Sequence, residues 1–86
     1  MPQFDTILYN ILHRSVIAMK DIPAIIKAAR IQANMTQQEL GEKMGYSGNS
    51  AQVAVRQWEL GRRPVPLEKI RALAAALSLT LDDLIP

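Results

Sequence analysis

Apolar side chains recur at intervals of three and four residues along almost the whole chain, and this spacing constrains the fold more than any other feature. In a helix such spacing gathers the apolar side chains on one face, whereas a half-buried strand needs strict alternation of apolar and polar residues. Alternating runs of β-branched residues do not occur in the sequence. The spacing therefore predicts an all-α fold, and 86 residues give room for one small domain.

Proline, glycine and capping residues divide this pattern into helices. We expect helices near residues 5–20, from Pro23 to about residue 33, from Thr36 to about residue 44, near residues 51–60, and from Pro66 to about residue 77, with a final turn after Thr80. Thr36 and Glu39 have the spacing of a capping box, and Asn34 and Gly61 stand where helices commonly end.

The apolar positions of these helices predict the core. Trp58, the only tryptophan, falls on the inward face of its helix, and so does Met44 on the helix before it. In the last two helical segments the residues expected to face inward are Leu67, Ile70, Leu73, Ala74, Leu77, Leu81, Leu84 and Ile85.

Residues 1–22 are predicted to form a helical extension ahead of a domain at residues 23–86. An apolar stripe at helical spacing marks this extension: Phe4, Ile7, Leu8, Ile11, Leu12 and Val16. Exposed together, these side chains would form a patch too apolar for a soluble monomer. We expect the extension either to pack on its own domain or to pair with the same helix of a second chain.

Composition excludes several classes of function. The chain has no cysteine and a single histidine, His13, so neither a disulfide nor a metal site is expected, and no cofactor is implied. Asp82 and Asp83 suit the first turn of a helix better than acid–base chemistry, so we do not expect an enzyme. No apolar run reaches the length of a membrane span and no signal peptide is evident, which favours a cytoplasmic protein without membrane contact.

The net charge of +2 is too small to indicate nucleic-acid binding by itself, but the charges are unevenly distributed. Residues 50–71 hold five basic and only two acidic side chains, and Arg62 and Arg63 are adjacent between Gly61 and Pro64. Two short helices separated by a glycine-containing turn, the second with glutamine and arginine on its outer face, are typical of a helix-turn-helix motif.

Several sequence blocks carry a more specific likeness. They are RIQ at residues 30–32, TQQELGEKMG at 36–45, WELGRR at 58–63, LEKI at 67–70 and ALSLTLDDL at 76–84. In order and spacing these blocks resemble the lambda-repressor/Cro-type (XRE-like) helix-turn-helix family over about residues 23–86. The resemblance implies a five-helix domain that reads the major groove of double-stranded DNA and regulates transcription, usually as a homodimer on a palindromic operator.

The resemblance also assigns DNA-contacting positions. Phosphate contacts are implied for Gln37 at the start of one helix and for Arg62 and Arg63 after the recognition helix. Base contacts are implied for the outward residues of the recognition helix, which are Gln52, Arg56 and Gln57. Glutamine can pair with adenine and arginine with guanine or phosphate, although each residue could also be an ordinary solvated side chain. Val53 beside them suits either a thymine methyl group or packing on the turn.

The turn before the recognition helix is longer than is common in the family, which leaves two alignments open. Counting back from Trp58, Ser50 caps the helix and Gln52 opens its reading face. Counting forward from the turn, Ser47 is the cap and Asn49 and Ser50 open that face. We favour the first alignment because the residues before Ser50 are poor helix formers, and Asn49 and Ser50 then remain candidate phosphate contacts.

Two further positions have structural roles by the same resemblance. Arg30 and Glu59 match a pair whose salt bridge ties the first domain helix to the end of the recognition helix. Gly41 stands where the family usually has alanine, and a small residue there lets the two helices of the motif approach.

From the resemblance as a whole we expect a DNA-binding transcriptional regulator, in the first place a repressor. The alternative is an antitoxin of a toxin–antitoxin pair that binds DNA and also a small protein partner through its N-terminal helix.

Overall fold

The computed structural model describes residues 21–85, and within that range the chain forms five α-helices, one 3₁₀ turn and no strand. The elements are α2 (Ile22–Gln32), α3 (Gln37–Lys43), α4 (Asn49–Glu59), the 3₁₀ turn η1 (Leu67–Lys69), α5 (Ile70–Leu77) and α6 (Leu81–Leu84). The all-α fold expected from the apolar spacing is confirmed. The helix expected near residues 5–20, with its apolar stripe and His13, lies outside the described residues.

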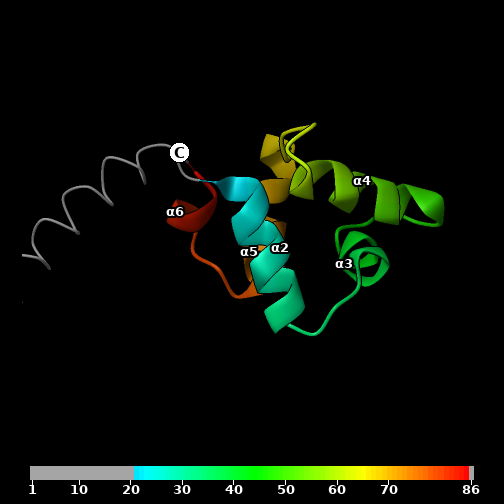
Figure 1. Cartoon of the computed structure of the whole chain (residues 1–86), viewed down its shortest axis with the longest axis horizontal. Helices are drawn as coiled ribbons and strands as arrows, with labels where there is room; N and C mark the ends of the chain where they lie inside the picture. Colours follow the sequence, from blue (N-terminus) through cyan, green and yellow to red (C-terminus); the bar gives the residue numbers. More distant parts are fainter. Residues whose placement is uncertain (1–20, 86) are drawn as a thin grey trace, which may run out of the picture.

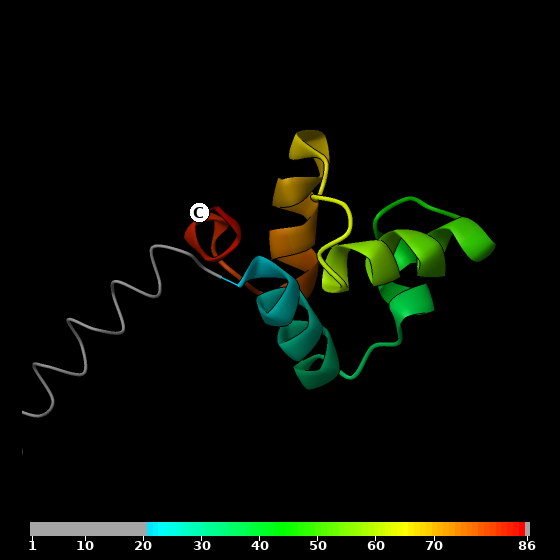
Figure 2. The same ribbon diagram turned by 45° about the horizontal axis from the view of Figure 1, so that its top comes forward.

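Helix α2 lies between the two ends of the domain. Figures 1 and 2 show α3 and α4 on one side of α2 and α6 on the other, with α5 beside α2. Helix α4 packs most extensively on α3 and also contacts α2, and α2 in turn contacts α5 and α6. The pair α3 and α4 is therefore held against the remaining helices mainly through α2.

At α2, α3 and α6 the side chain of the preceding residue accepts a hydrogen bond from an N–H of the first helical turn. The Asp21 carboxylate accepts a hydrogen bond of 3.2 Å from the N–H of Ala24 at the start of α2. At α3 the predicted capping box is present, because the Thr36 hydroxyl accepts from the Glu39 N–H at 3.0 Å and the Glu39 carboxylate from the Thr36 N–H at 2.9 Å. Thr80 begins α6 with a second capping box.

Four helices end at a residue with a left-handed backbone. The positive φ angles belong to Asn34 (59°), Gly45 (94°), Gly61 (70°) and Ser78 (55°). After each of them the next N–H donates to a carbonyl five residues earlier in the chain, as in the Schellman motif. The predicted helix ends at Asn34 and Gly61 are thus confirmed.

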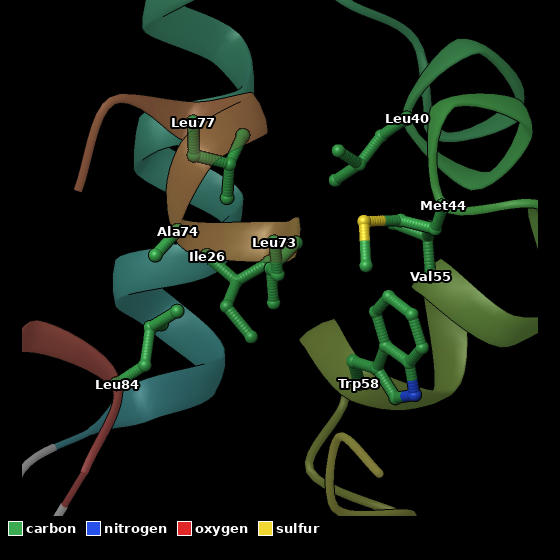
Figure 3. Packing of buried hydrophobic residues seen from close by; sticks show 9 residues of the cluster. All are labelled: Ile26, Leu40, Met44, Val55, Trp58, Leu73, Ala74, Leu77 and Leu84. Atoms are coloured by element: carbon green, nitrogen blue, oxygen red, sulfur yellow. The ribbon is translucent and has the colours of Figure 1, made fainter. Parts of the chain in front are cut away.

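The core joins all five helices. Figure 3 shows side chains of α3 and α4 facing those of α2, α5 and α6. Its buried members are Ile26, Leu40, Met44, Val55, Trp58, Leu73, Ala74, Leu77 and Leu84. Trp58 is only 4% exposed, as expected, and the Tyr46 ring packs edge-on against it at 5.9 Å between centroids. This aromatic pair fixes the turn after α3 to the last turn of α4.

Three residues that were expected to face the core are exposed instead. Leu67 is 85% exposed, Ile85 46% and Leu81 39%. Leu67 lies in η1, and α-helical geometry begins only at Ile70. Three residues complete a turn in a 3₁₀ helix, so Leu67 does not continue the stripe that α-helical spacing predicts. Helix α6 has only four residues, and of these Leu84 alone is buried.

Candidate nucleic-acid interface

The helices α3 and α4 touch through their backbones at Gly41. Gly41 is buried in α3, and Ala51 of α4 is fully buried opposite it. A Cβ built on Gly41 would lie 2.6 Å from the Cα of Ala51, closer than the 3.0 Å that real Cβ contacts keep. The missing side chain therefore permits the close approach of the two helices that the sequence predicted.

A side-chain hydrogen bond that the sequence pattern did not indicate holds the turn between α3 and α4. The Gln38 side-chain amide donates to the Gly48 carbonyl at 3.0 Å. The same carbonyl accepts the Ala51 N–H at 3.2 Å and so begins α4. Because one acceptor serves both contacts, Gln38 links the start of α4 directly to α3. No local sequence pattern indicates that the Gln38 side chain bonds the turn ten residues away.

The start of α4 lies between the starts that the two alignments predicted. Gly48 is its N-cap, with φ 59° and ψ −145° and no side-chain cap, and Asn49 is its first residue. The prediction that Ser50 caps the helix is therefore wrong, and so is the alternative of Ser47. Gly48 adopts a backbone conformation that residues with a side chain rarely reach, which favours glycine at this position. As a result Asn49 and Ser50 lie within the first turn of α4.

Opposite its buried face, α4 presents polar side chains to solvent. Ala51, Val55 and Trp58 form the buried face. The exposed residues on the other side are Asn49, Ser50, Gln52, Val53 and Arg56, and Gln57 is half-buried. Val53 is 52% exposed and lies one helical turn from both Asn49 and Arg56. All the predicted recognition-helix positions therefore lie on one helix, with Gln57 least accessible among them.

A cluster of polar side chains joins α2, α3 and α4 behind this face. The Glu59 carboxylate accepts from Arg30 Nε at 2.6 Å and from Arg30 Nη2 at 3.1 Å. Gln37 Nε2 donates to the same carboxylate at 3.1 Å, and Arg30 Nη1 donates to the Met35 carbonyl at 2.8 Å. The side chains of Arg30 and Glu59 are 12% and 3% exposed, so the cluster is largely shielded from water. It fixes the start of α3 to the end of α4.

The two arginines after α4 stand on a backbone that is hydrogen-bonded to the helix. The N–H groups of Arg62 and Arg63 donate to the Gln57 carbonyl at 3.0 and 3.3 Å. Both arginines are exposed, and Gly61 before them turns the chain. Their side chains therefore leave the protein from a fixed position at the end of α4.

Lys69 contributes less to the exposed charge than its sequence position suggests. Its Nζ donates to the Met44 carbonyl at 3.1 Å and lies 4.7 Å from the centre of the Tyr46 ring. The ammonium group thus caps the end of α3 and makes a cation–π contact.

Within residues 21–85, no three His, Cys, Asp or Glu side chains gather as a metal site. None of the described helices is long and apolar enough to span a membrane.

Two packed helices with a tight glycine turn, an exposed polar face on the second helix and arginines directly after it define a DNA-binding helical domain. Residues 26–84 match the family model described as helix-turn-helix. The chain therefore belongs to the helix-turn-helix family, of the lambda-repressor-like (XRE) type, whose members are DNA-binding regulators of transcription. No curated protein and no solved structure gives a significant match to this sequence.

Proposed function

We propose that the chain is a sequence-specific repressor that binds a palindromic operator in double-stranded DNA as a homodimer. The observation that carries this proposal is the exposed polar face of α4, followed directly by two exposed arginines. An α-helix fits the major groove of B-DNA, where every base pair presents a distinct set of hydrogen-bonding groups.

Base recognition is assigned to the outward residues of α4. Gln52 carries an amide that can both donate to and accept from adenine, and Arg56 can bind guanine or a phosphate through two parallel hydrogen bonds. Val53 is exposed between them and suits contact with a thymine methyl group. Asn49 and Ser50 in the first turn reach either base edges or the neighbouring backbone, because a recognition helix contacts bases mainly through its N-terminal residues.

Phosphate contacts orient this helix. Arg62 and Arg63 flank its C-terminal end, and Gln37 stands at the start of α3. The Gln37 amide nitrogen has two N–H groups, and one of them donates to Glu59. The second can donate to a phosphate oxygen while the bond to Glu59 holds the side chain in place. Gln57 is half-buried, so it is the weakest candidate for a base contact.

Pairing of two chains follows from the symmetry of a palindromic site. A dimer that binds successive major grooves places its two recognition helices about 34 Å apart. Repression needs only that the bound dimer occupies the operator, whereas activation needs a further surface for the transcription machinery. Residues 1–22 are the proposed pairing extension.

Selection of binding sites from random duplex DNA by the purified chain tests this function. We expect a palindromic motif with half-sites about one helical turn apart. Gln52→Ala should weaken binding by about 1–3 kcal/mol and relax the preference at one position of each half-site. Arg62→Ala should weaken binding to all sequences alike and reduce the salt slope by about one per bound protomer.

Lys27→Ala is the matched control, because it removes one exposed positive charge from α2 without touching α3 or α4. It should change the salt slope little and the sequence preference not at all. If the unmodified chain enriches no motif over random DNA, sequence-specific regulation is not its function. If Lys27→Ala matches Arg62→Ala, binding follows net charge, not the interface.

A further inference from the structure

An apolar groove lies between the start of α2, the end of α4 and the segment that leads into α5. Its volume is about 440 Å³. Ile22 and Pro23 line it where the described chain begins, and Val65, Leu67 and Ile70 line it further along. Leu67 is 85% exposed, which is unusual for a large apolar side chain that adjoins other apolar residues. The groove therefore lacks a covering element within residues 21–85.

The chain itself carries a segment of matching chemistry. Residues 1–20 lie outside the described structure and end next to Ile22 and Pro23, at the edge of the groove. Their apolar stripe, from Phe4 to Val16 at helical spacing, needs an apolar surface to cover it. The sequence thus contains one stripe that needs an apolar partner, and the described residues contain one uncovered groove.

The length of the connection decides which copy of the groove the segment occupies. Asp21 caps α2, so the helix that the sequence predicts near residues 5–20 would leave about one residue between itself and α2. Helices that fold back on each other need connections of roughly two to five residues. Pro23 within the first turn of α2 further restricts the chain at Ile22. A connection this short favours exchange of the segment between two chains over folding back on its own domain.

We propose that residues 4–16 of each chain dock into this groove of a second copy and form an exchanged homodimer. Each chain gives one stripe and receives one, so the two contacts are identical and neither a stripe nor a groove is left to recruit a third chain. The proposal rests on the homodimer suggested above but not on DNA binding, and its tests use protein without DNA.

Sedimentation equilibrium of the full chain and of Leu67→Glu tests the groove. The side chain at this position is mostly exposed, so the substitution leaves the domain core intact. A charge within the apolar contact should weaken each docking at least about tenfold, and the dimer about hundredfold because both grooves change. Ile31→Glu is the control, since Ile31 is 58% exposed on α2 but does not line the groove, and it should leave the dissociation constant unchanged.

A flexible insert of about six Gly and Ser residues between Lys20 and Asp21 tests the exchange itself. With a longer connection each stripe can reach its own groove, so we expect the dimer to convert to a monomer. A dimer with an unchanged dissociation constant in this variant would overturn the exchange. An unchanged constant in Leu67→Glu would overturn the groove as the docking site, while the homodimer would stand. A full chain that remains monomeric up to about millimolar concentration would overturn the exchange and the homodimer together, but not DNA recognition.

Discussion

Removing one partner of the ion pair between Arg30 and Glu59 is expected to destabilise the protein more than removing both. Glu59→Gln keeps the shape of the side chain but removes the negative charge that offsets the Arg30 guanidinium, which is 12% exposed and is left with neutral acceptors such as the Met35 carbonyl. Arg30→Met leaves a carboxylate that is 3% exposed, with a single bond from Gln37. Stranding one charge of a buried pair costs about 3–5 kcal/mol, and we expect about 3 for the first variant and 4 for the second.

The double variant Arg30→Met/Glu59→Gln should be less destabilised than either single variant. It contains no stranded charge, and the methionine still covers the surface beneath the guanidinium. The amide oxygen that replaces the Glu59 carboxylate can still accept from Gln37, so a loss of about 2 kcal/mol is expected. The two substitutions should therefore be non-additive by several kcal/mol.

Urea denaturation followed by tryptophan fluorescence measures these differences. Trp58 is the only tryptophan in the chain, and it is buried beside Glu59. A domain of this size is stable by roughly 3–10 kcal/mol, so the single variants are measured at low temperature and checked for helix content by circular dichroism. Single losses below about 1 kcal/mol that simply add in the double variant would refute the reasoning, because the pair would then behave as a solvated surface pair.

Three further predictions concern stability and are checked by chemical denaturation. Gly41→Ala should lower the free energy of unfolding by about 1–2 kcal/mol. The cost of overpacking against the α4 backbone exceeds the gain of about 1 kcal/mol in helix propensity. A more stable variant would show that the two helices separate easily. The pKa of Glu39 is held below its ordinary value of 4.5, first by the Thr36 backbone N–H and then by the Thr36 hydroxyl. The stability that this carboxylate contributes is complete above pH 4.5 and is lost as the pH falls through the lowered pKa, so Glu39→Gln should flatten that part of the acid profile. Leu84→Ala should cost about 2–4 kcal/mol, whereas Ile85→Ala, at a half-exposed side chain, should cost less than about 1 kcal/mol.

Features set by neighbouring residues could be predicted from the sequence. The capping box of Thr36 with Glu39 depends on a spacing of three residues, and the left-handed helix ends at Asn34 and Gly61 depend on the identity of one residue. The contact between Arg30 and Glu59 is different, because the residues are 29 positions apart and no local pattern joins them. Only the family resemblance pointed to it.

Features set by contacts across the fold were missed. The start of α4 could not be predicted from neighbouring residues. Gly48 caps the helix in a turn conformation that the hydrogen bond from Gln38 helps to hold. Leu67 has the spacing of a core residue, but the 3₁₀ geometry of η1 changes the direction of its side chain. In both cases a turn of special geometry overrides a spacing that assumes a regular α-helix.

The placement of the charges links the two proposals. The Lys69 ammonium group is bound by the Met44 carbonyl and the Tyr46 ring. The basic side chains around the end of α4 that remain for DNA are therefore Arg56, Arg62 and Arg63. Three phosphate contacts would give one protomer a salt slope of only about −3, and two joined protomers about −5. One domain alone should therefore bind DNA weakly at physiological salt, and operator affinity should depend on pairing. Leu67 lies in η1 and not on the α4 face, but Arg63 lines the same groove. Leu67→Glu should therefore lower operator affinity through the loss of the dimer and, to a smaller degree, through the negative charge placed near Arg63. Only the first effect should vanish at protein concentrations that restore pairing.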